Sequence, residues 1–107
     1  MEVNAQRKQR SNPRFRRRWR VDLKAGDAGV SSPAFTREVS AGGFSAELMR
    51  VPAPGTRVRG SIVIGVTVYT FIGKVAWSRA GEPRMNLLGR IGVAFSEIAD
   101  DWKAKLT

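Results

Sequence analysis

The sequence contains neither cysteine nor histidine among its 107 residues. Disulfides, thiol nucleophiles, imidazole bases and the usual zinc ligand sets are therefore all excluded. These absences argue against an enzyme, a metal site and a bound cofactor. Acidic residues are also scarce, because only nine Asp and Glu stand against 19 Lys and Arg, which gives a formal net charge of +10.

Long apolar runs are missing as well. No stretch of about 18 apolar residues occurs, as a membrane-spanning helix would need, and the N-terminus lacks the apolar core of a signal peptide. We therefore expect a cytoplasmic protein with no membrane span. Hydrophobic residues still make up 42% of the chain, which is enough for one core in a domain of this length.

The positive charge is concentrated near the N-terminus. Residues 7–20 contain eight Lys and Arg and no acid, whereas residues 21–107 contain eleven basic and eight acidic side chains. Clustered cations favour an anionic, phosphate-bearing partner, although a solvated tail shows the same pattern. Because residues 1–13 have no apolar period, we expect a disordered arm there and a folded domain at residues 14–107.

Short runs of alternating apolar residues, separated by Gly, Pro and Ser, predict β-strands in the rest of the chain. Phe44, Ala46 and Leu48 fall on one face of an extended segment, as a half-buried strand requires. The prolines of residues 51–56 then end this strand, because proline has no N–H to donate to a ladder.

Two runs rich in β-branched and aromatic residues, 57–66 and 68–77, predict a hairpin that turns around residues 65–67. Alternation in the second run places Trp77 in the core. Residues 89–95 supply a last strand. About six strands would close into a small antiparallel β-barrel, so the predicted fold class is all-β.

The apolar period changes near the C-terminus. Ile98, Trp102 and Leu106 stand four residues apart, acids precede lysines, and Ser96 is placed to cap a helix. We therefore expect a short C-terminal α-helix that packs on the barrel and buries Trp102.

The segment RFRRRWR at residues 14–20 contains five arginines. Arg16 and Arg20 lie four residues apart, and Arg20 directly precedes an alternating run, so Arg20 is anchored and Arg16 reaches ahead of it. Guanidinium groups bind phosphate and the O6/N7 edge of guanine through paired donors. This favours a guanine and phosphate ligand, although a generic basic stretch has the same spacing. Trp19 either stacks on a base or pins the arm to the barrel.

A second candidate feature is the sequence REVSAGGF at residues 37–44. Glu38 and Ser40 project from one side of an extended segment, so together they can accept and donate along a base edge. Gly42 and Gly43 permit a tight turn and a close approach of the backbone to a ligand. An ordinary turn between strands is the alternative interpretation.

The order of these parts resembles that of the PilZ family. An RxxxR pair precedes the first strand, a turn resembling the [D/N]xSxxG motif follows it, and a GVAF strand closes the domain. PilZ domains are small antiparallel β-barrels with a terminal helix, and many bind cyclic di-GMP. The resemblance spans about residues 14–98 and rests on RRRWR at 16–20, EVSAGG at 38–43, GKVAW at 73–77 and IGVAF at 91–95.

The resemblance implies that Arg16 and Arg20 clamp guanine and phosphate, because family members place the second arginine directly before the first strand. It matches Ser40 and Gly43 to the serine and the final glycine of the turn motif. Arg14 with Arg18 is the alternative register. The expected cyclic di-GMP contacts are Arg16, Arg20, Glu38, Ser40 and Gly43, with Arg17, Arg18, Trp19 and Gly42 as secondary members.

One position departs from the family pattern. Glu38 stands where Asp or Asn is usual, and its side chain is longer by one methylene. If this carboxylate accepts hydrogen bonds from a guanine edge, the longer side chain would clash with the guanine, turn away from it, or weaken the contact by about 1–3 kcal/mol. The affinity for the ligand, rather than the fold, depends on this change.

The resemblance implies a receptor in bacterial second-messenger signalling. Ligand binding would order the arginine-rich arm on the barrel and so change the contact with a downstream protein. One alternative is a β-barrel that binds nucleic acid nonspecifically, and another is a ligand-free adaptor. Because residues 21–107 carry a net charge of only +3, a compact ligand is favoured over nucleic acid, which would need cations across the barrel face.

Overall fold

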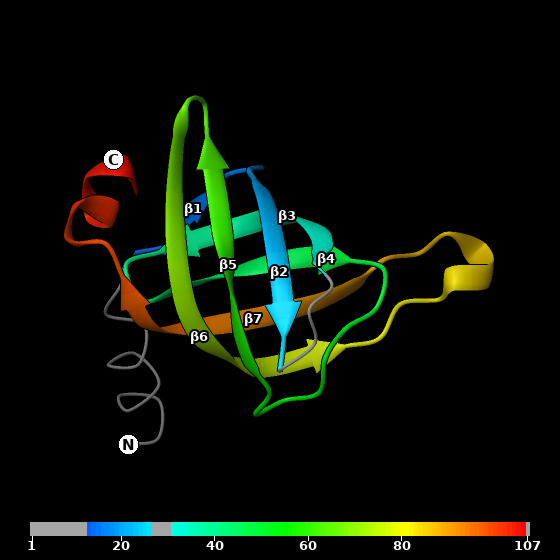
Figure 1. Ribbon diagram of the computed structural model, residues 1–107. Helices are drawn as coiled ribbons and strands as arrows, with labels where there is room; N and C mark the ends of the chain where they lie inside the picture. Colours follow the sequence, from blue (N-terminus) through cyan, green and yellow to red (C-terminus); the bar gives the residue numbers. More distant parts are fainter. Residues whose placement is uncertain (1–12, 27–30, 107) are drawn as a thin grey trace, which may run out of the picture.

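A computed structural model describes residues 13–26 and 31–106, so most of the expected arm, residues 1–12, lies outside the described residues. The described strands form one antiparallel sheet in the order β1-β3-β2-β5-β6-β7-β4. Because β3 also pairs with β4, six strands close into a barrel, and β1 adds to the edge of β3 (Figure 1). This confirms the predicted barrel. The strands are β1 (Phe15–Arg16), β2 (Arg20–Ala25), β3 (Ser32–Ser40), β4 (Gly43–Leu48), β5 (Arg57–Ile64), β6 (Thr67–Arg79) and β7 (Gly89–Ile98).

The core lies inside the barrel, because alternate residues of each strand point inward. Phe44, Ala46 and Leu48 alternate into it as predicted, and at most 5% of each is exposed. Aromatic rings fill the centre through edge-to-face and tilted contacts, which aromatic pairs prefer to a face-to-face sandwich. Phe44 lies 5.2 Å from Phe71 and 5.8 Å from Phe95, measured between ring centroids.

The predicted hairpin between β5 and β6 is confirmed. Ile64 pairs with Thr67, so only Gly65 and Val66 form the turn. Gly65 has a φ of 61°, the positive angle that a type II′ turn needs at its first central position. The turn holds Val66 in solvent at one end of the barrel.

The C-terminal helix is present but differs from the prediction in type and starting point. β7 continues through Ile98, so Ser96 belongs to the strand, and its hydroxyl donates to the Ile72 carbonyl at 3.1 Å instead of capping a helix. The helix η2 (Asp100–Leu106) is a 3₁₀-helix. Its seven residues are few for an α-helix, which is marginal below about 12–15 residues without packing. Trp102 and Leu106 are buried, as expected.

Trp77 lies on the outer surface, contrary to the prediction that it belongs to the core. Its exposed fraction is 46%. The pairing of β6 with β7 shifts register between Val75 and Trp77. A β-bulge of this kind inserts one extra residue and reverses which side chains face inward. Strict alternation from Val75 therefore assigned Trp77 to the wrong face.

Trp102 closes one end of the barrel. Its side chain is fully buried, and its indole N–H donates to the Ser40 carbonyl at 2.9 Å. The ring makes edge-to-face contacts with Trp19, Tyr69 and Phe95 at centroid distances of 5.6–6.0 Å. The helix, the end of β3 and the segment before β2 thus meet at a single side chain.

The described part of the chain has no helix that combines the length and the apolar character needed to cross a bilayer. Its two helical segments are short. They are η2 at the C-terminus and the three-residue 3₁₀ turn η1 (Pro83–Met85) between β6 and β7.

Tyr69 provides a pH test of this packing. Burial raises the pKa of the Tyr69 phenol above its ordinary value of 10.0, and the Asp101 carboxylate, which accepts a hydrogen bond from the phenol, raises this pKa further. The folded state therefore holds the phenolic proton more tightly than the unfolded chain does. The resulting stability is fully present below about pH 10 and is lost as the pH rises through the raised pKa.

Because Tyr69 is the only tyrosine in the sequence, phenolate absorbance measures it directly. We expect a titration midpoint above 10.0 in the native protein, a lower midpoint in Asp101→Asn, and a value near the ordinary one in guanidinium chloride. A native midpoint at or below the denatured one would contradict the packing described.

Candidate functional site

An open pocket of about 400 Å³ lies on the outer face of the barrel, across β3, β4, β7 and the end of β6. This volume falls within the range of roughly 300–1,000 Å³ that small-molecule sites usually have. The side chains in it that can bind a ligand through polar or aromatic contacts are Arg14, Glu38, Ser40, Ser45 and Trp77.

The ladder pairing explains how this pocket forms. One row of directly paired residues crosses β6, β7, β4, β3 and β1, and directly paired residues point to the same face of a sheet. Gly92 and Ser45 are small, so the middle of the row is low, whereas longer side chains stand on both sides. The row consists of Trp77, Gly92, Ser45, Glu38 and Arg16.

Trp77 rests on the backbone of Gly92. A Cβ atom added to Gly92 would lie 2.1 Å from Nε1 of the Trp77 indole, so only glycine leaves room for the ring. Aromatic side chains often cover a glycine on a neighbouring strand in this way. Sequence reasoning did not include Trp77 among the site residues. The outward-facing Gly92 was the signal that could have indicated an aromatic ring lying over it.

Glycine is required at Gly43 because two strands approach closely. A Cβ there would lie 1.9 Å from the carbonyl oxygen of Val93 on β7. Gly42 accepts a backbone hydrogen bond from Phe95 at 2.8 Å. Neither Gly42 nor Gly43 has a positive φ, so the turn after Ser40 does not depend on the conformational freedom of glycine that was expected.

Arg14 and Arg16 flank Glu38 at the edge of the pocket. Arg16 is the ladder partner of Glu38, and Nη1 of Arg14 lies 3.7 Å from Oε1 of Glu38. Both members of the Arg14 pair are substantially exposed, and such ion pairs contribute about 0–1 kcal/mol. The Glu38 carboxylate therefore remains available to a ligand. Among the described residues, Arg14, from the alternative register, is the arginine that lines the pocket.

Arg20 lies away from the pocket. It begins β2, where its Nη2 donates to Oδ1 of Asp22 at 3.2 Å. Its ladder partner on β3 is Phe35, which is three residues from Glu38. At about 3.3 Å per residue, this places Arg20 roughly 10 Å along the strand from Glu38. The structure thus brings Arg16, but not Arg20, beside the acidic side of the pocket.

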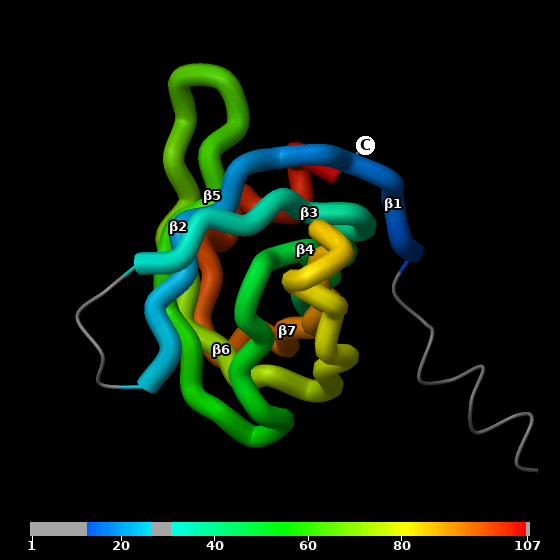
Figure 2. The backbone as a smooth tube through the Cα atoms, turned by 90° about the vertical axis from the view of Figure 1, so that its right-hand side faces the viewer, coloured from blue at the N-terminus to red at the C-terminus, as the bar shows by residue number. Residues whose placement is uncertain are grey.

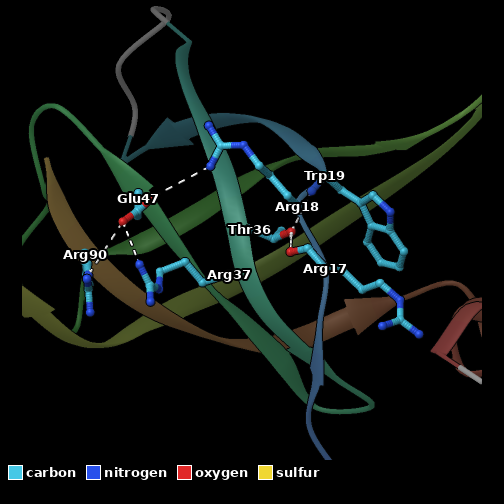
Figure 3. A network of polar contacts seen from close by, with 7 residues as sticks. All are labelled: Arg17, Arg18, Trp19, Thr36, Arg37, Glu47 and Arg90. Atoms are coloured by element: carbon cyan, nitrogen blue, oxygen red, sulfur yellow. Dashed lines mark hydrogen bonds and ion pairs between the residues drawn. The ribbon is translucent and has the colours of Figure 1, made fainter.

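Arg17 and Arg18 point to opposite sides of the segment that precedes β2 (Figure 3). Arg17 donates to the Arg16 carbonyl at 2.7 Å and lies over the Phe15 ring. Arg18 lies 4.5 Å from the centroid of the Phe35 ring and also forms an ion pair on β4. Neither side chain lines the pocket.

Glu47 gathers three arginines from separate parts of the chain (Figure 3). Nη1 of Arg37 donates to its Oε2 at 2.8 Å, and Arg18 and Arg90 lie 3.8 and 3.7 Å from the carboxylate. Three positive charges against one negative charge leave the cluster cationic. Glu47 is two residues from Ser45 along β4, so this charge lies next to the pocket. Sequence reasoning missed Arg37, Glu47 and Arg90 because strand pairing brings them together.

Thr36 fastens the segment before β2 to the barrel. This buried side chain accepts a hydrogen bond from the Trp19 N–H at 2.8 Å and donates to the Arg17 carbonyl at 2.5 Å. The Trp19 ring packs edge to face on Trp102. Trp19 therefore holds the segment before β2 against the barrel.

The candidate residues thus divide into two groups. Glu38, Ser40, Gly42 and Gly43 line one pocket, and Arg16 adjoins it. Arg17, Arg18, Trp19 and Arg20 lie outside its lining. Across residues 13–26 and 31–106 no group of three or more Asp or Glu side chains is arranged to hold a metal ion.

Comparison with known proteins rests on structure. No protein-family model matches the sequence, and no curated protein matches it. The PilZ domain with c-di-GMP of YcgR from Escherichia coli superposes with a TM-score of 0.66 at 15% identity, over 92% of this chain and 86% of that chain. The chain has the PilZ fold.

A second PilZ-type likeness is to the Bacillus subtilis inhibitor of motility MotI/DgrA. The TM-score is 0.71 at 17% identity, and the match covers 90% of this chain but only 46% of that chain. The chain therefore spans less than half the length of the Bacillus subtilis protein. The fold that the motifs indicated is confirmed by both superpositions.

The attachment of the segment before β2 to the barrel can be tested at Thr36. Thr36→Val keeps the shape of the side chain but leaves the Trp19 N–H and the Arg17 carbonyl without this partner. Burying such groups unpaired costs about 1–3 kcal/mol, and we expect a loss of that size in the free energy of unfolding, measured in urea. The exposed Thr70→Val on β6 is the control and should change it by less than about 0.5 kcal/mol. Equal losses in the two variants would contradict the role of Thr36.

Proposed function

We propose that this chain is a non-catalytic receptor for cyclic di-GMP. The observation that carries this proposal is that Glu38, Ser40 and Trp77 line one open pocket beside an arginine-rich segment. The same fold in the YcgR domain has been solved with cyclic di-GMP. That domain is a precedent for the ligand, and the pocket supplies the chemistry.

The pocket offers a partner for each part of the ligand. Cyclic di-GMP contains two guanines and two phosphates. The exposed face of Trp77 can stack on a guanine, and the Glu38 carboxylate can accept hydrogen bonds from the N–H groups of a guanine edge. Arg14 and Arg16 can donate to phosphate oxygens or to the O6/N7 edge. The neighbouring Glu47 cluster adds a positive field that attracts the phosphates.

The proposed switch is a movement of the arginine side chains. Arg16 already lies beside Glu38, but Arg20 would have to leave Asp22 and turn toward the ligand. Arg17 and Arg18 would turn toward the ligand as well and add contacts to its phosphates. The segment before β2 is already fastened by Thr36, so the part of the chain that the ligand would newly hold on the barrel is residues 1–13. A downstream protein would recognise this ordered state.

Calorimetry with cyclic di-GMP tests whether the chain binds this ligand and which pair of arginines holds it. At about 0.15 M salt, which screens charges beyond roughly 8 Å, we expect saturable binding. Arg16→Ala and Arg20→Ala should each weaken it roughly 10- to 150-fold, because a hydrogen bond to a charged group contributes about 1.5–3 kcal/mol. Arg57→Ala, at the start of β5, is the matched control and should leave the affinity unchanged.

The other outcomes separate the alternatives. Larger losses in Arg14→Ala and Arg18→Ala would assign the ligand to the alternative register. Salt-sensitive binding of single-stranded DNA without binding of cyclic di-GMP would replace the receptor by nonspecific nucleic-acid binding. No heat with cyclic di-GMP, GTP or DNA would leave a ligand-free adaptor.

Trp77 gives a second test of the same pocket. Trp77→Ala should weaken cyclic di-GMP binding roughly 5- to 150-fold, since base stacking on an aromatic ring contributes about 1–3 kcal/mol. Trp77→Phe should retain most of the affinity, because it keeps an aromatic face. Trp77→Phe should unfold at nearly the wild-type temperature because it still covers Gly92, so it separates the stacking role from any loss of stability in Trp77→Ala. An unchanged affinity in Trp77→Ala would remove the stacking role.

A further inference from the structure

The connection between β6 and β7 forms a hairpin that extends away from the barrel. It projects to the right in Figure 1 and toward the viewer in Figure 2. Its backbone is held by its own hydrogen bonds, because Glu82 and Leu87 exchange two of them at 2.8 and 3.0 Å. Asn86 takes a left-handed conformation with a φ of 57° and ends the turn η1. The tip is therefore a preorganised structure.

Apolar side chains gather on this hairpin and at its base. Met85, Leu87 and Leu88 are 69, 55 and 42% exposed, and Met49 is 51% exposed. Met49 follows Leu48, whose ladder partner Gly89 follows Leu88, so Met49 lies at the base of the hairpin. We name these four side chains the hairpin patch. Single exposed apolar residues are ordinary, whereas four of them on one short hairpin and at its base offer a partner several apolar anchors.

Arginines lie at the base and in the tip of the hairpin. Arg79 and Arg90 are direct ladder partners at the base of the hairpin, and Arg84 lies in its tip. Like charges placed directly opposite each other on a sheet are destabilising. Glu47 lies near Arg90 but is shared with two further arginines. An anionic partner that approached this surface would relieve the repulsion between Arg79 and Arg90.

We propose that the hairpin patch is a docking surface for an acidic, apolar protein segment, such as an amphipathic helix with Asp or Glu beside its leucines. Methionine adapts its shape to different apolar partners, and both methionine and arginine are enriched in protein interfaces. The arginines at the rim would steer and orient the acidic segment. A chain with a net charge of +10 opposes the pairing of two copies through this basic surface.

The composition of the hairpin favours a protein over a lipid surface. Residues 80–90 contain no lysine and no aromatic side chain, and they include Glu82. Segments that lie in a membrane interface are typically amphipathic helices, and Trp and Tyr are the residues enriched at that depth, whereas this segment is a short hairpin without an aromatic anchor. The patch also adjoins the candidate pocket, because Trp77 and Gly92 are two residues from Arg79 and Arg90 on the same strands. The docking surface itself does not depend on any ligand of the pocket.

Methionine labelling makes the patch directly observable. The sequence contains three methionines, and two of them, Met49 and Met85, belong to the patch. The full chain would carry ¹³C-methyl methionine and be titrated with a panel of acidic amphipathic helical peptides containing Leu, Glu and Asp. We expect saturable shifts of both patch methyl resonances. Matched peptides with Lys in place of each acid should leave these resonances unchanged.

Two pairs of variants locate the contact. The double variant Leu87→Ser with Leu88→Ser should weaken binding of the acidic peptide about tenfold or more, as the loss of central apolar anchors does. The matched control is Val66→Ser with Val68→Ser, which removes two exposed apolar side chains from the hairpin between β5 and β6. Arg84→Glu should also weaken binding of the acidic peptide, whereas Lys103→Glu on the exposed side of η2 should leave it unchanged.

Five results would overturn the proposal, the first four of which concern the peptides and variants. These four are no shift with any acidic peptide, equal shifts with the lysine peptides, equal losses in the control variants, and larger shifts with anionic phospholipid vesicles than with the peptides. Shifts that depend on protein concentration without peptide would instead assign the surface to self-association and overturn it as well. Binding of cyclic di-GMP is measured separately, so failure of the receptor proposal and failure of the docking proposal are distinguishable.

Discussion

The buried Trp102 ring is the contact on which the rest of the structure depends. It closes one end of the barrel, its N–H donates to the Ser40 carbonyl, and its ring packs against Trp19. Ser40 begins the turn at the candidate pocket, and Trp19 anchors the arginine-rich segment. A single side chain from the C-terminal helix therefore fixes both the acidic side of the pocket and the position from which the arginines extend. The two are joined through the core.

The pocket itself is a consequence of close strand approach. Gly43 lies against the Val93 carbonyl and Gly92 lies under the Trp77 ring, so the outer surface of β4 and β7 is low between taller side chains. A ligand seated there would contact several strands whose relative positions are fixed by ladder hydrogen bonds. The arginines, in contrast, stand on a short segment with exposed side chains. This combination of a rigid floor and movable cationic side chains suits a binding site that must also report occupancy.

The proposed ligand site and the proposed docking surface share two strands. β6 and β7 carry Trp77 and Gly92 in the pocket, and two residues further they carry Arg79 and Arg90 at the base of the apolar hairpin. Glu47 lies between the two regions and holds arginines from β3, β7 and the segment before β2. Its balance of charge would change if a phosphate approached from the pocket or a carboxylate from the hairpin. An anion bound at one of the two surfaces would therefore change the electrostatic potential at the other.

The sequence by itself determined the barrel, because inward and outward residues alternate along most strands and Gly65 marks a two-residue turn. It also indicated the turn at residues 38–43, through its paired glycines, and the burial of Trp102, through the four-residue spacing of apolar side chains near the C-terminus. Only the tertiary structure decided the face of Trp77, the extension of β7 through Ser96, the separation of Arg16 from Arg20 and the grouping of arginines around Glu47. Each of these depends on strand register, on a bulge or on residues far apart in the chain. Register is set when strands pair, so local alternation cannot predict it.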